Sequence, residues 1–263
     1  MHQLSSSQFQ VVLPLAFGAS HSRALIYAVL EGHSPGTVWV NDRQTPTAAL
    51  VCTNCGYMFV LGNATNQCFN QAICSTIFNS VLPGSPGSEV ILFSFSEKWR
   101  VILDELLKER EAQRIHRCLF DLDEEMFRKR SLQQEMLLPE GFTITSLQDR
   151  STASTLNLTT WFDTDRFIRD GFGYCILHSD QVVSACYSVF LGGGEAEVDV
   201  FTADDYRRHG FAHRVATAFI EESLKRGIEP AWACWPHRQA SQSLARKLGF
   251  RPRPDATAHY FSA

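Results

Sequence analysis

Residues 195–226 follow a continuous pattern of a short strand, a basic loop and a long helix. The strand is predicted at residues 196–202. The helix is predicted at residues 210–226, where two glutamates precede a lysine and an arginine by four residues, the favourable order for helix ion pairs. Its apolar stripe consists of Val215, Phe219, Ile220 and Leu224. Gly227 follows as the expected C-terminal stop.

The loop between the strand and the helix, residues 207–212, has the form R-x-x-G-x-A. Free N–H groups at a helix N-terminus form an anion site, which the helix dipole reinforces. Gly210 has no Cβ to keep a diphosphate away from these groups. Arg207, Arg208 and His209 add local positive charge. The loop by itself leaves two interpretations open, a phosphate cradle and a tight turn with solvated arginines.

Composition bounds the class of protein. The chain has 263 residues and a formal net charge of −4, which gives no global electrostatic reason to expect nucleic acid or an anionic membrane as partner. No apolar run approaches the roughly 20 residues of a membrane span, and residues 1–10 lack the pattern of a secretory signal. Eight scattered cysteines indicate reduced thiols. We therefore predict a cytoplasmic protein with no nucleic-acid partner and no membrane partner.

The cysteines and histidines do not predict a metal site. Cys52 and Cys55, with Cys68 and Cys74, invite a zinc interpretation because four thiolates suit a structural site. However, the first pair reads as hairpin residues, and five residues rather than two separate the second pair. The nine histidines show no H-x-x-x-H spacing. We expect no metal.

The rest of the chain predicts strands that alternate with a few helices in both halves. In the first half, strands are expected at residues 37–40, 48–52, 57–61, 90–95 and 115–122, and helices at 68–81 and from 99 to about 114. In the second half, strands are expected at 142–147, 173–178, 182–190, 231–235 and from 250 onward, and helices at 154–160, 165–169 and 239–248. A charged stretch at residues 123–135 separates two predicted domains, residues 1–135 and 138–263.

The order of strand, R-x-x-G-x-A loop, long helix, strand and closing helix resembles the GNAT N-acetyltransferase superfamily. Residues 206–212 match its pyrophosphate-binding motif, and residues 241–250 match its closing helix. The likeness is closer to the zwittermicin A resistance-type acetyltransferases, through Trp161-Phe162, Phe167, Gly171-Phe172-Gly173-Tyr174, Glu197-Val198-Asp199-Val200 with Thr202, Trp232, Cys234 and Ser241-x-x-Leu244-Ala245. The resemblance covers residues 138–261.

The resemblance implies an α/β (α+β) fold with a GNAT-like mixed sheet and flanking helices in the C-terminal half. For the first half, similar element order implies a degenerate GNAT-like domain without the phosphate loop. The resemblance also implies acetyl-CoA as co-substrate, in a V-shaped opening between the parallel strands at residues 196–202 and 231–235. The implied cofactor-binding residues are Val200, Phe201 and Thr202 for the pantetheine, Arg207, Arg208, His209, Gly210, Phe211, Ala212 and His213 for the diphosphate, and Arg238 and Ser241 of the closing helix.

Glu197 is the predicted general base, because it lies on the strand where some family members place a glutamate base. We expect burial to raise its pKa toward neutrality and suit it to accept a proton. Asp199 lies on the same face of the strand by period-two alternation. The alternative is that both carboxylates face solvent or bind a cationic substrate.

The general acid is less well defined by the sequence. Many family members carry a tyrosine on the closing helix where this chain has Ala245, and an asparagine that often starts that helix is Arg238 here. Tyr260 is the candidate we name, and Ser241, His237 or water are the alternatives.

These features predict an acetyl-CoA-dependent N-acetyltransferase that acts on a primary amine. The acceptor that we favour is a small molecule. Two alternatives stay open. One is a protein N-acetyltransferase that acts on an N-terminus or a lysine. The other is an acyl-CoA-binding module without catalytic activity. A homodimer is left open as the assembly state.

Overall fold

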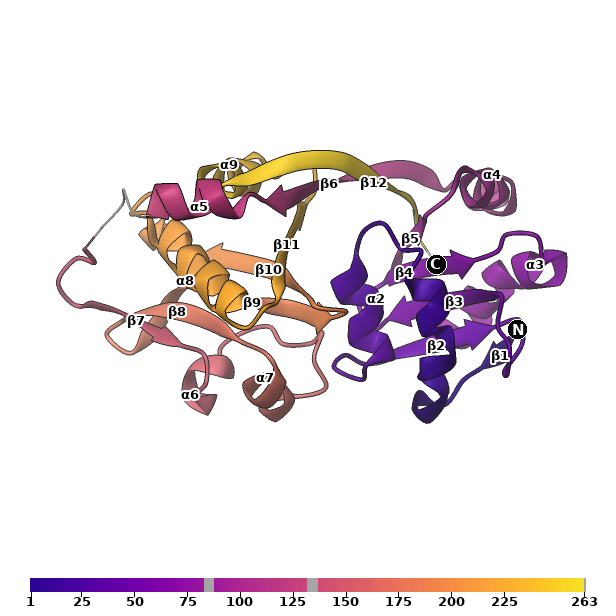
Figure 1. Cartoon of the computed structure of the whole chain (residues 1–263), viewed down its shortest axis with the longest axis horizontal. Helices are drawn as coiled ribbons and strands as arrows, with labels where there is room; N and C mark the ends of the chain where they lie inside the picture. Colours follow the sequence, from indigo (N-terminus) through magenta and orange to yellow (C-terminus); the bar gives the residue numbers. More distant parts are fainter. Residues whose placement is uncertain (83–87, 132–136, 263) are drawn as a thin grey trace. The chain divides into compact units, whose positions relative to one another are not determined.

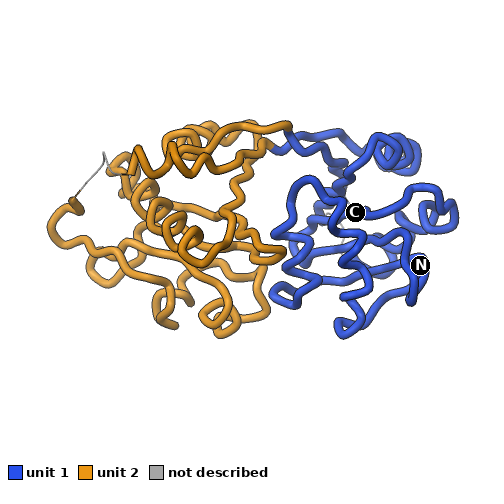
Figure 2. The backbone as a smooth tube through the Cα atoms, viewed as in Figure 1, with its two compact units in different colours: residues 1–117, 255–263 blue, residues 118–254 orange. Residues whose placement is uncertain are grey.

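The computed structural model describes residues 1–82, 88–131 and 137–262, and the chain forms two compact units (Figure 2). Unit 1 comprises residues 1–117 and 255–263, and unit 2 comprises residues 118–254. The domain ranges 1–135 and 138–263 stay a prediction, and their boundary falls largely at residues 132–136, outside the described residues.

Unit 1 contains a sheet and helices that alternate with its strands (Figure 1). Its strands are β1 (His2–Gln3), β2 (Gly36–Val40), β3 (Ala48–Thr53), β4 (Tyr57–Gly62), β5 (Glu89–Ser94) and the first part of β6 (Gln113–Leu122). Its helices are α1 (Leu13–Ala16), α2 (Arg23–Leu30), α3 (Gln67–Thr76) and α4 (Glu97–Leu106), with the short helical turns η1 (Ser6–Val12), η2 (Ile77–Val81) and η3 (Lys108–Arg110).

Unit 2 also consists of a sheet and flanking helices. Its strands are β7 (Phe142–Ser146), β8 (Gly173–His178), β9 (Gln181–Gly192), β10 (Glu195–Thr202), β11 (Glu229–Cys234) and the first part of β12 (Phe250–Ser262). Its helices are α5 (Glu124–Ser131), α6 (Arg150–Ala153), α7 (Thr164–Asp170), α8 (Phe211–Lys225) and α9 (Gln239–Lys247), with the 3₁₀ turn η4 (Asp204–Tyr206).

The two units share one strand arrangement. In unit 1 the order is β1-β2-β3-β4-β5-β12, and in unit 2 it is β7-β8-β9-β10-β11-β6. In each unit neighbouring strands are antiparallel except for one parallel pair, β4 with β5 and β10 with β11. The last strand of each order comes from the other half of the chain, since residues 258–262 pair with β5 and residues 118–120 pair with β11. The chain is therefore an internal repeat in which each half contributes one strand to the other unit.

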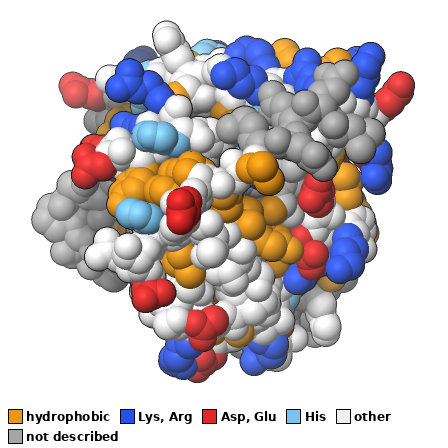
Figure 3. Space-filling model, turned by 90° about the vertical axis from the view of Figure 1, so that its left-hand side faces the viewer, with side chains coloured by type: hydrophobic (Ala, Val, Ile, Leu, Met, Phe, Trp, Pro, Cys, Tyr) orange, Lys and Arg blue, Asp and Glu red, His pale blue; other side chains and the backbone are white. Residues whose placement is uncertain are grey.

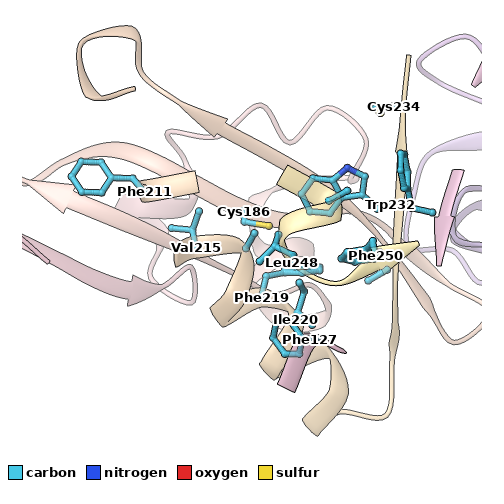
Figure 4. Packing of buried hydrophobic residues seen from close by; sticks show 14 of the residues in the cluster. Phe127, Cys186, Phe211, Val215, Phe219, Ile220, Trp232, Cys234, Leu248 and Phe250 are labelled. Atoms are coloured by element: carbon cyan, nitrogen blue, oxygen red, sulfur yellow. The ribbon is translucent and has the colours of Figure 1, made fainter. Parts of the chain in front are cut away.

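Apolar side chains of α8 pack against one face of the unit 2 sheet (Figure 4). Phe211, Val215 and Phe219 of α8 join Cys186 and Trp232 of the strands in this core. Burial of a side chain such as Phe219 contributes about 1.5–3 kcal/mol. The opposite face carries a second core under α6 and α7, which contains Trp161, Phe167 and Tyr187. The sheet of unit 2 is thus covered on both faces.

The predicted mixed sheets with flanking helices are confirmed, as are most of the individual elements. The helix predicted at residues 154–160 is wrong, since the regular helix α6 ends at Ala153 and a loop follows. Side chains of this loop bond to the backbone of β9, as described below. The helix predicted to reach residue 114 ends earlier, because β6 begins at Gln113. None of the helices in the described part of the chain combines the length and the apolar character that a membrane span requires.

Candidate active site

The parallel pairing of β10 with β11 is short. It comprises Glu195 with Glu229, Ala196 with Pro230 and Glu197 with Ala231. Beyond this point β11 pairs with β6 on its other side, while β10 stays paired with β9 as far as Thr202 and Ser184. The two strands therefore part after Glu197 and Ala231, and the edge of β10 that faces β11 is open from Val198 onward.

Backbone groups of alternate residues point to this open edge. The Gly194 carbonyl accepts from the N–H of Glu229 on the β11 side, whereas the N–H of Ala203 donates to Val183 on the β9 side. Residues 198, 200 and 202 lie an even number of positions after Gly194 and therefore have its orientation. Their backbone N–H and C=O groups face the opening. The Phe201 carbonyl accepts from Ser184 Oγ at 2.8 Å and faces β9. Of the predicted pantetheine-binding residues, Val200 and Thr202 lie at the open edge. Val198 joins them, and strand alternation alone would have found it.

The loop after β10 turns sharply before α8. Arg208 has φ = 67° and Gly210 has φ = 79°, both in the left-handed region that glycine adopts without strain. Gly210 is the N-cap of α8 and no side chain caps the helix. The N–H groups of the first turn, from Phe211, Ala212 and His213, have no partner within the helix. An uncapped helix start of this kind is an anion-binding arrangement.

The basic side chains of the loop are exposed and differ in their contacts. Arg207 forms an ion pair with Asp204 at 2.6 Å and donates from Nε to the Thr202 carbonyl at 3.4 Å. His209 Nδ1 lies 3.2 Å from the Tyr206 carbonyl oxygen. The predicted diphosphate residues 207–213 therefore lie together around the start of α8.

A cluster of aromatic side chains from β7, β8 and the start of α8 packs beside the loop that precedes α8. Phe142 stacks on His178 with ring centroids 4.3 Å apart and contacts Phe211 at 4.8 Å. The His178 Nδ1 atom lies 3.0 Å from the Tyr206 hydroxyl. On the face of the molecule at this end, hydrophobic side chains lie beside histidines, and lysines and arginines gather along the upper edge (Figure 3). The sequence predicted β7 and β8 but not that their side chains hold the loop.

Glu197 is 3 % exposed and lies at the last pair before the strands part. Asp199 is exposed and lies on the same face of β10, as strand alternation predicted. Its Oδ2 accepts a hydrogen bond from the hydroxyl of Tyr187 at 3.0 Å. Burial raises the pKa of Tyr187 far above its ordinary value, and the neighbouring Asp199 charge adds to this. Tyr187 therefore stays protonated and donates to Asp199.

The predicted residues of the closing helix lie at the start of α9. Arg238 is its exposed N-cap. The Ser241 hydroxyl accepts from Trp232 Nε1 at 3.1 Å, which ties α9 to β11. His213 of α8 is half-buried, and burial lowers the pKa of its imidazole. Ala245 is buried in the unit 2 core.

Tyr260, the predicted general acid, lies in unit 1, whereas Glu197 lies in unit 2. It pairs with Ile91 of β5, and its hydroxyl donates to Glu89 Oε1 at 2.7 Å. Its role as a proton donor stays a prediction. Among the described residues there is no cluster of three or more His, Cys, Asp or Glu side chains that could hold a metal ion.

The corresponding part of unit 1, the described strands β4 and β5 and helix α3, differs from the arrangement at the start of α8. Its parallel pair β4 and β5 ends at Val60 and Ser94. The helix that follows β4 is capped by the Asn66 side chain, which accepts from the N–H of Phe69 at 2.9 Å. The Trp99 indole donates to the carbonyl of Gly62, the last residue of β4, at 2.9 Å. Unit 1 therefore repeats the strand order, but the helix that follows β4 is capped by a side chain, and its last parallel pair, Val60 with Ser94, carries no carboxylate.

Unit 2 thus combines parallel strands that part after three pairs with an uncapped helix start that suits an anion. Residues 16–258 match the family model described as GNAT acetyltransferase. The chain therefore belongs to the GNAT acetyltransferase family, whose members generally use acetyl-CoA, and it is an N-acetyltransferase by this membership.

Relatives and solved structures agree with this assignment. The Bacillus subtilis (strain 168) protein named uncharacterized N-acetyltransferase YdfB is 31 % identical over 254 residues, 94 % of each chain. A GCN5-related N-acetyltransferase-like protein from Streptococcus suis 89/1591 is 25 % identical, with a TM-score of 0.69 over 98 % of this chain and 99 % of that chain. A tandem GNAT protein from the clavulanic acid biosynthesis pathway shares the fold, with 12 % identity and a TM-score of 0.66 over 99 % and 97 % of the two chains.

Proposed function

We propose that this protein transfers the acetyl group of acetyl-CoA to a primary amine of a small molecule, and that unit 2 carries out the transfer. The observation that carries the proposal is the position of Glu197. It is a buried carboxyl side chain at the last parallel pair, next to the open edge of β10 and one loop before the uncapped start of α8.

The residues of unit 2 fit acetyl-CoA. The N–H groups at the start of α8 suit the diphosphate, because they have no partner in the helix and no side chain caps them. Arg208 and His209 add exposed basic groups beside them. The backbone groups of Val200 and Thr202 at the open edge suit the amides of the pantetheine arm, which extend a strand as a peptide would.

Bound acetyl-CoA would supply the acetyl group as a thioester. An amine attacks only in its neutral form, so a group of the protein must accept the proton of the ammonium ion. Glu197 lies on the strand edge that parts from β11 and is the carboxylate best placed for that proton. Holding the amine beside the acetyl group also contributes to the rate, since it converts a bimolecular step into an intramolecular one. As the C–N bond forms, the C–S bond of the thioester breaks and coenzyme A leaves as its thiolate, which then takes up a proton.

The choice of a small molecule as acceptor rests on two supports. Motifs of unit 2 resemble those of the zwittermicin A resistance-type acetyltransferases. In addition, Glu197 is almost fully buried within unit 2, which suits a compact acceptor better than an extended peptide. The alternatives, a protein acceptor and an acyl-CoA-binding module without catalysis, remain outcomes of the test.

The test is release of the coenzyme A thiol from acetyl-CoA, measured with the full chain against a library of small amines and against peptides with free N-termini or lysines. We expect turnover with small amines. Turnover with peptides alone would move the function to protein acetylation. Acetyl-CoA binding without turnover on any amine or peptide would overturn the proposal.

A further inference from the structure

Three side chains of β10 lie on the sheet face opposite α8. Val198 and Val200 pack into the core with α8, so the intervening Glu197, Asp199 and Phe201 project from the other face. Phe201 is 39 % exposed and Asp199 is exposed, whereas Glu197 is buried. This face therefore presents a carboxylate and an aromatic ring beside the proposed base.

The loop at residues 157–161 lies along β9 next to these residues. Thr160 Oγ1 donates to the Val189 carbonyl at 2.6 Å, and Trp161 Nε1 donates to the Ser188 carbonyl at 3.0 Å. The pairing of β9 with β10 shifts register at this point, because Phe190 faces Glu197 while Ser188 faces Val198. Val189 is the extra residue of this bulge. The loop is thus fixed to the bulge beside Glu197.

Tyr187 connects this loop to Asp199. It lies directly opposite Asp199 in the β9–β10 register, is 3 % exposed, and donates to Asp199 Oδ2 at 3.0 Å. Its hydroxyl also lies 3.4 Å from the Asn157 carbonyl oxygen. The phenol is buried in the core under α6 and α7, so its hydroxyl has little freedom to move. The position of the Asp199 carboxylate is therefore set by a rigid donor.

The hydrogen bond from Tyr187 to Asp199 gives Asp199 and Glu197 different positions relative to the opening between β10 and β11. Tyr187 belongs to β9, so it draws the Asp199 side chain away from β11 and from the opening where the strands part. Glu197, at the last pair with Ala231, lies at that opening. Asp199 is consequently held toward β9 and is not placed to take the proton of the reacting amine.

We infer that Asp199, held in place by Tyr187, binds a second cationic group of the acceptor, so that the acceptor is a short diamine or another base with two amino groups. This inference rests on the proposed function of the same site. Residues two positions apart on a strand are about 7 Å apart, so the reacting amine near Glu197 and the anchored ammonium group near Asp199 can belong to one short molecule. The exposed ring of Phe201, two positions further on, offers a face to that second cation.

The experiment compares 1,4-diaminobutane with butylamine, which differ only in the second amino group. We expect the wild-type protein to have the lower KM for the diamine. Asp199→Asn and Tyr187→Phe should each raise the KM for the diamine by about tenfold and leave the KM values for butylamine and acetyl-CoA unchanged. Tyr187 is a positioning residue, and the ring retained in Tyr187→Phe separates loss of the hydrogen bond from loss of packing.

The matched control is Tyr174→Phe, which removes a phenol hydroxyl from the neighbouring strand β8 on the α8 side of the sheet. It should leave the diamine KM unchanged. The inference is overturned where the wild-type protein shows equal KM values for the two amines, or where Asp199→Asn and Tyr187→Phe affect both amines equally.

A binding measurement keeps this inference separate from the proposed function. 1,4-Diaminobutane is titrated calorimetrically into the full chain in the presence of coenzyme A, which requires no acetyl transfer. Binding that weakens about tenfold in Asp199→Asn supports the inference even where no turnover is found. Absence of diamine binding alongside turnover of monoamines overturns the inference and leaves the proposed function standing.

Discussion

Glu197 and Ala231 form the last pair of the parallel ladder between β10 and β11, and the strands part directly after them. The carboxyl group of Glu197 is therefore buried at the point where the open edge of β10 begins. In unit 1 the last parallel pair is Val60 with Ser94, so the same position of the repeat carries a valine. We expect acetyl transfer to depend on unit 2, because its last pair carries an ionisable side chain and its following helix is uncapped.

Replacing Glu197 with glutamine should lower kcat on the order of a hundredfold at neutral pH and below. The amide cannot accept the proton of the ammonium ion, so the loss should shrink as pH rises and more of the amine is already neutral. The measurement is kcat from about pH 6 to pH 10. Glu229→Gln, an exposed position at the start of β11, is the control and should keep the wild-type profile. An unchanged pH–rate profile for Glu197→Gln would remove Glu197 from the mechanism.

Gly210→Asp should abolish the thermal stabilisation that acetyl-CoA gives. With φ = 79°, position 210 strains any side chain, although Asn and Asp tolerate this conformation better than most residues. Gly210→Asn is therefore the matched control, since it imposes the same backbone strain without a charge. The aspartate carboxylate lies at the helix start and repels the diphosphate. Stabilisation by acetyl-CoA that survives in Gly210→Asp would show that the diphosphate binds elsewhere.

Tyr206→Phe should raise the KM for acetyl-CoA by about three- to tenfold, because it removes the hydrogen bond of 3.0 Å to His178 that fixes the loop before α8. His178→Ala removes the same bond and the ring that stacks on Phe142. The double variant should fall short of the product of the two single effects, since both break one interaction. Steady-state kinetics of the four proteins test this. Fully multiplicative effects would mean that the two residues act independently.

Local patterns predicted the elements of unit 2 that carry the candidate site. The stripe from Val215 to Leu224 and the stop at Gly227 defined α8, since both depend on residues close together in the sequence. The R-x-x-G-x-A spacing predicted the turn, and the structure gives Gly210 the positive φ that such a turn requires. Alternation along β10 placed Glu197 and Asp199 on one face.

Features that depend on long-range pairing were not predictable in this way. The pairings of β6 with β11 and of β12 with β5 join residues far apart in the sequence. The residue pattern of each strand does not indicate which strand it pairs with. The prediction of a helix at residues 154–160 was wrong because long-range contacts decide the structure there. Hydrogen bonds from Thr160 and Trp161 to β9 fix this segment as a loop. Tyr187 gave no functional signal, since only the register opposite Asp199 makes it a donor.

The exchanged strand β12 offers a last prediction, on stability. In unit 1, Asp104 of α4 accepts from Arg114 of β6, with Nε at 2.9 Å, and lies 2.9 Å from Nε2 of the buried His259 of β12. The pKa of Asp104 is lowered to about 2, and the hydrogen bond from Arg114 is the largest cause. Because the folded-state pKa lies below the ordinary value, the stabilising effect of this carboxylate is present above about pH 4 and is lost as pH falls toward 2.

Asp104→Asn should therefore lower the Tm by about 1–3 °C near pH 6, a small shift because Asp104 is exposed and solvent screens its ion pair. The difference from the wild-type protein should diminish as pH is lowered toward 2, where the wild-type carboxyl group also loses its charge. Scanning calorimetry at several pH values measures both effects. Glu105→Gln, the exposed neighbour on the same helix, is the control and should show no such pH-dependent difference. A Tm difference for Asp104→Asn that stays constant between pH 6 and pH 2 would mean that the charge of Asp104 does not hold β12 in unit 1.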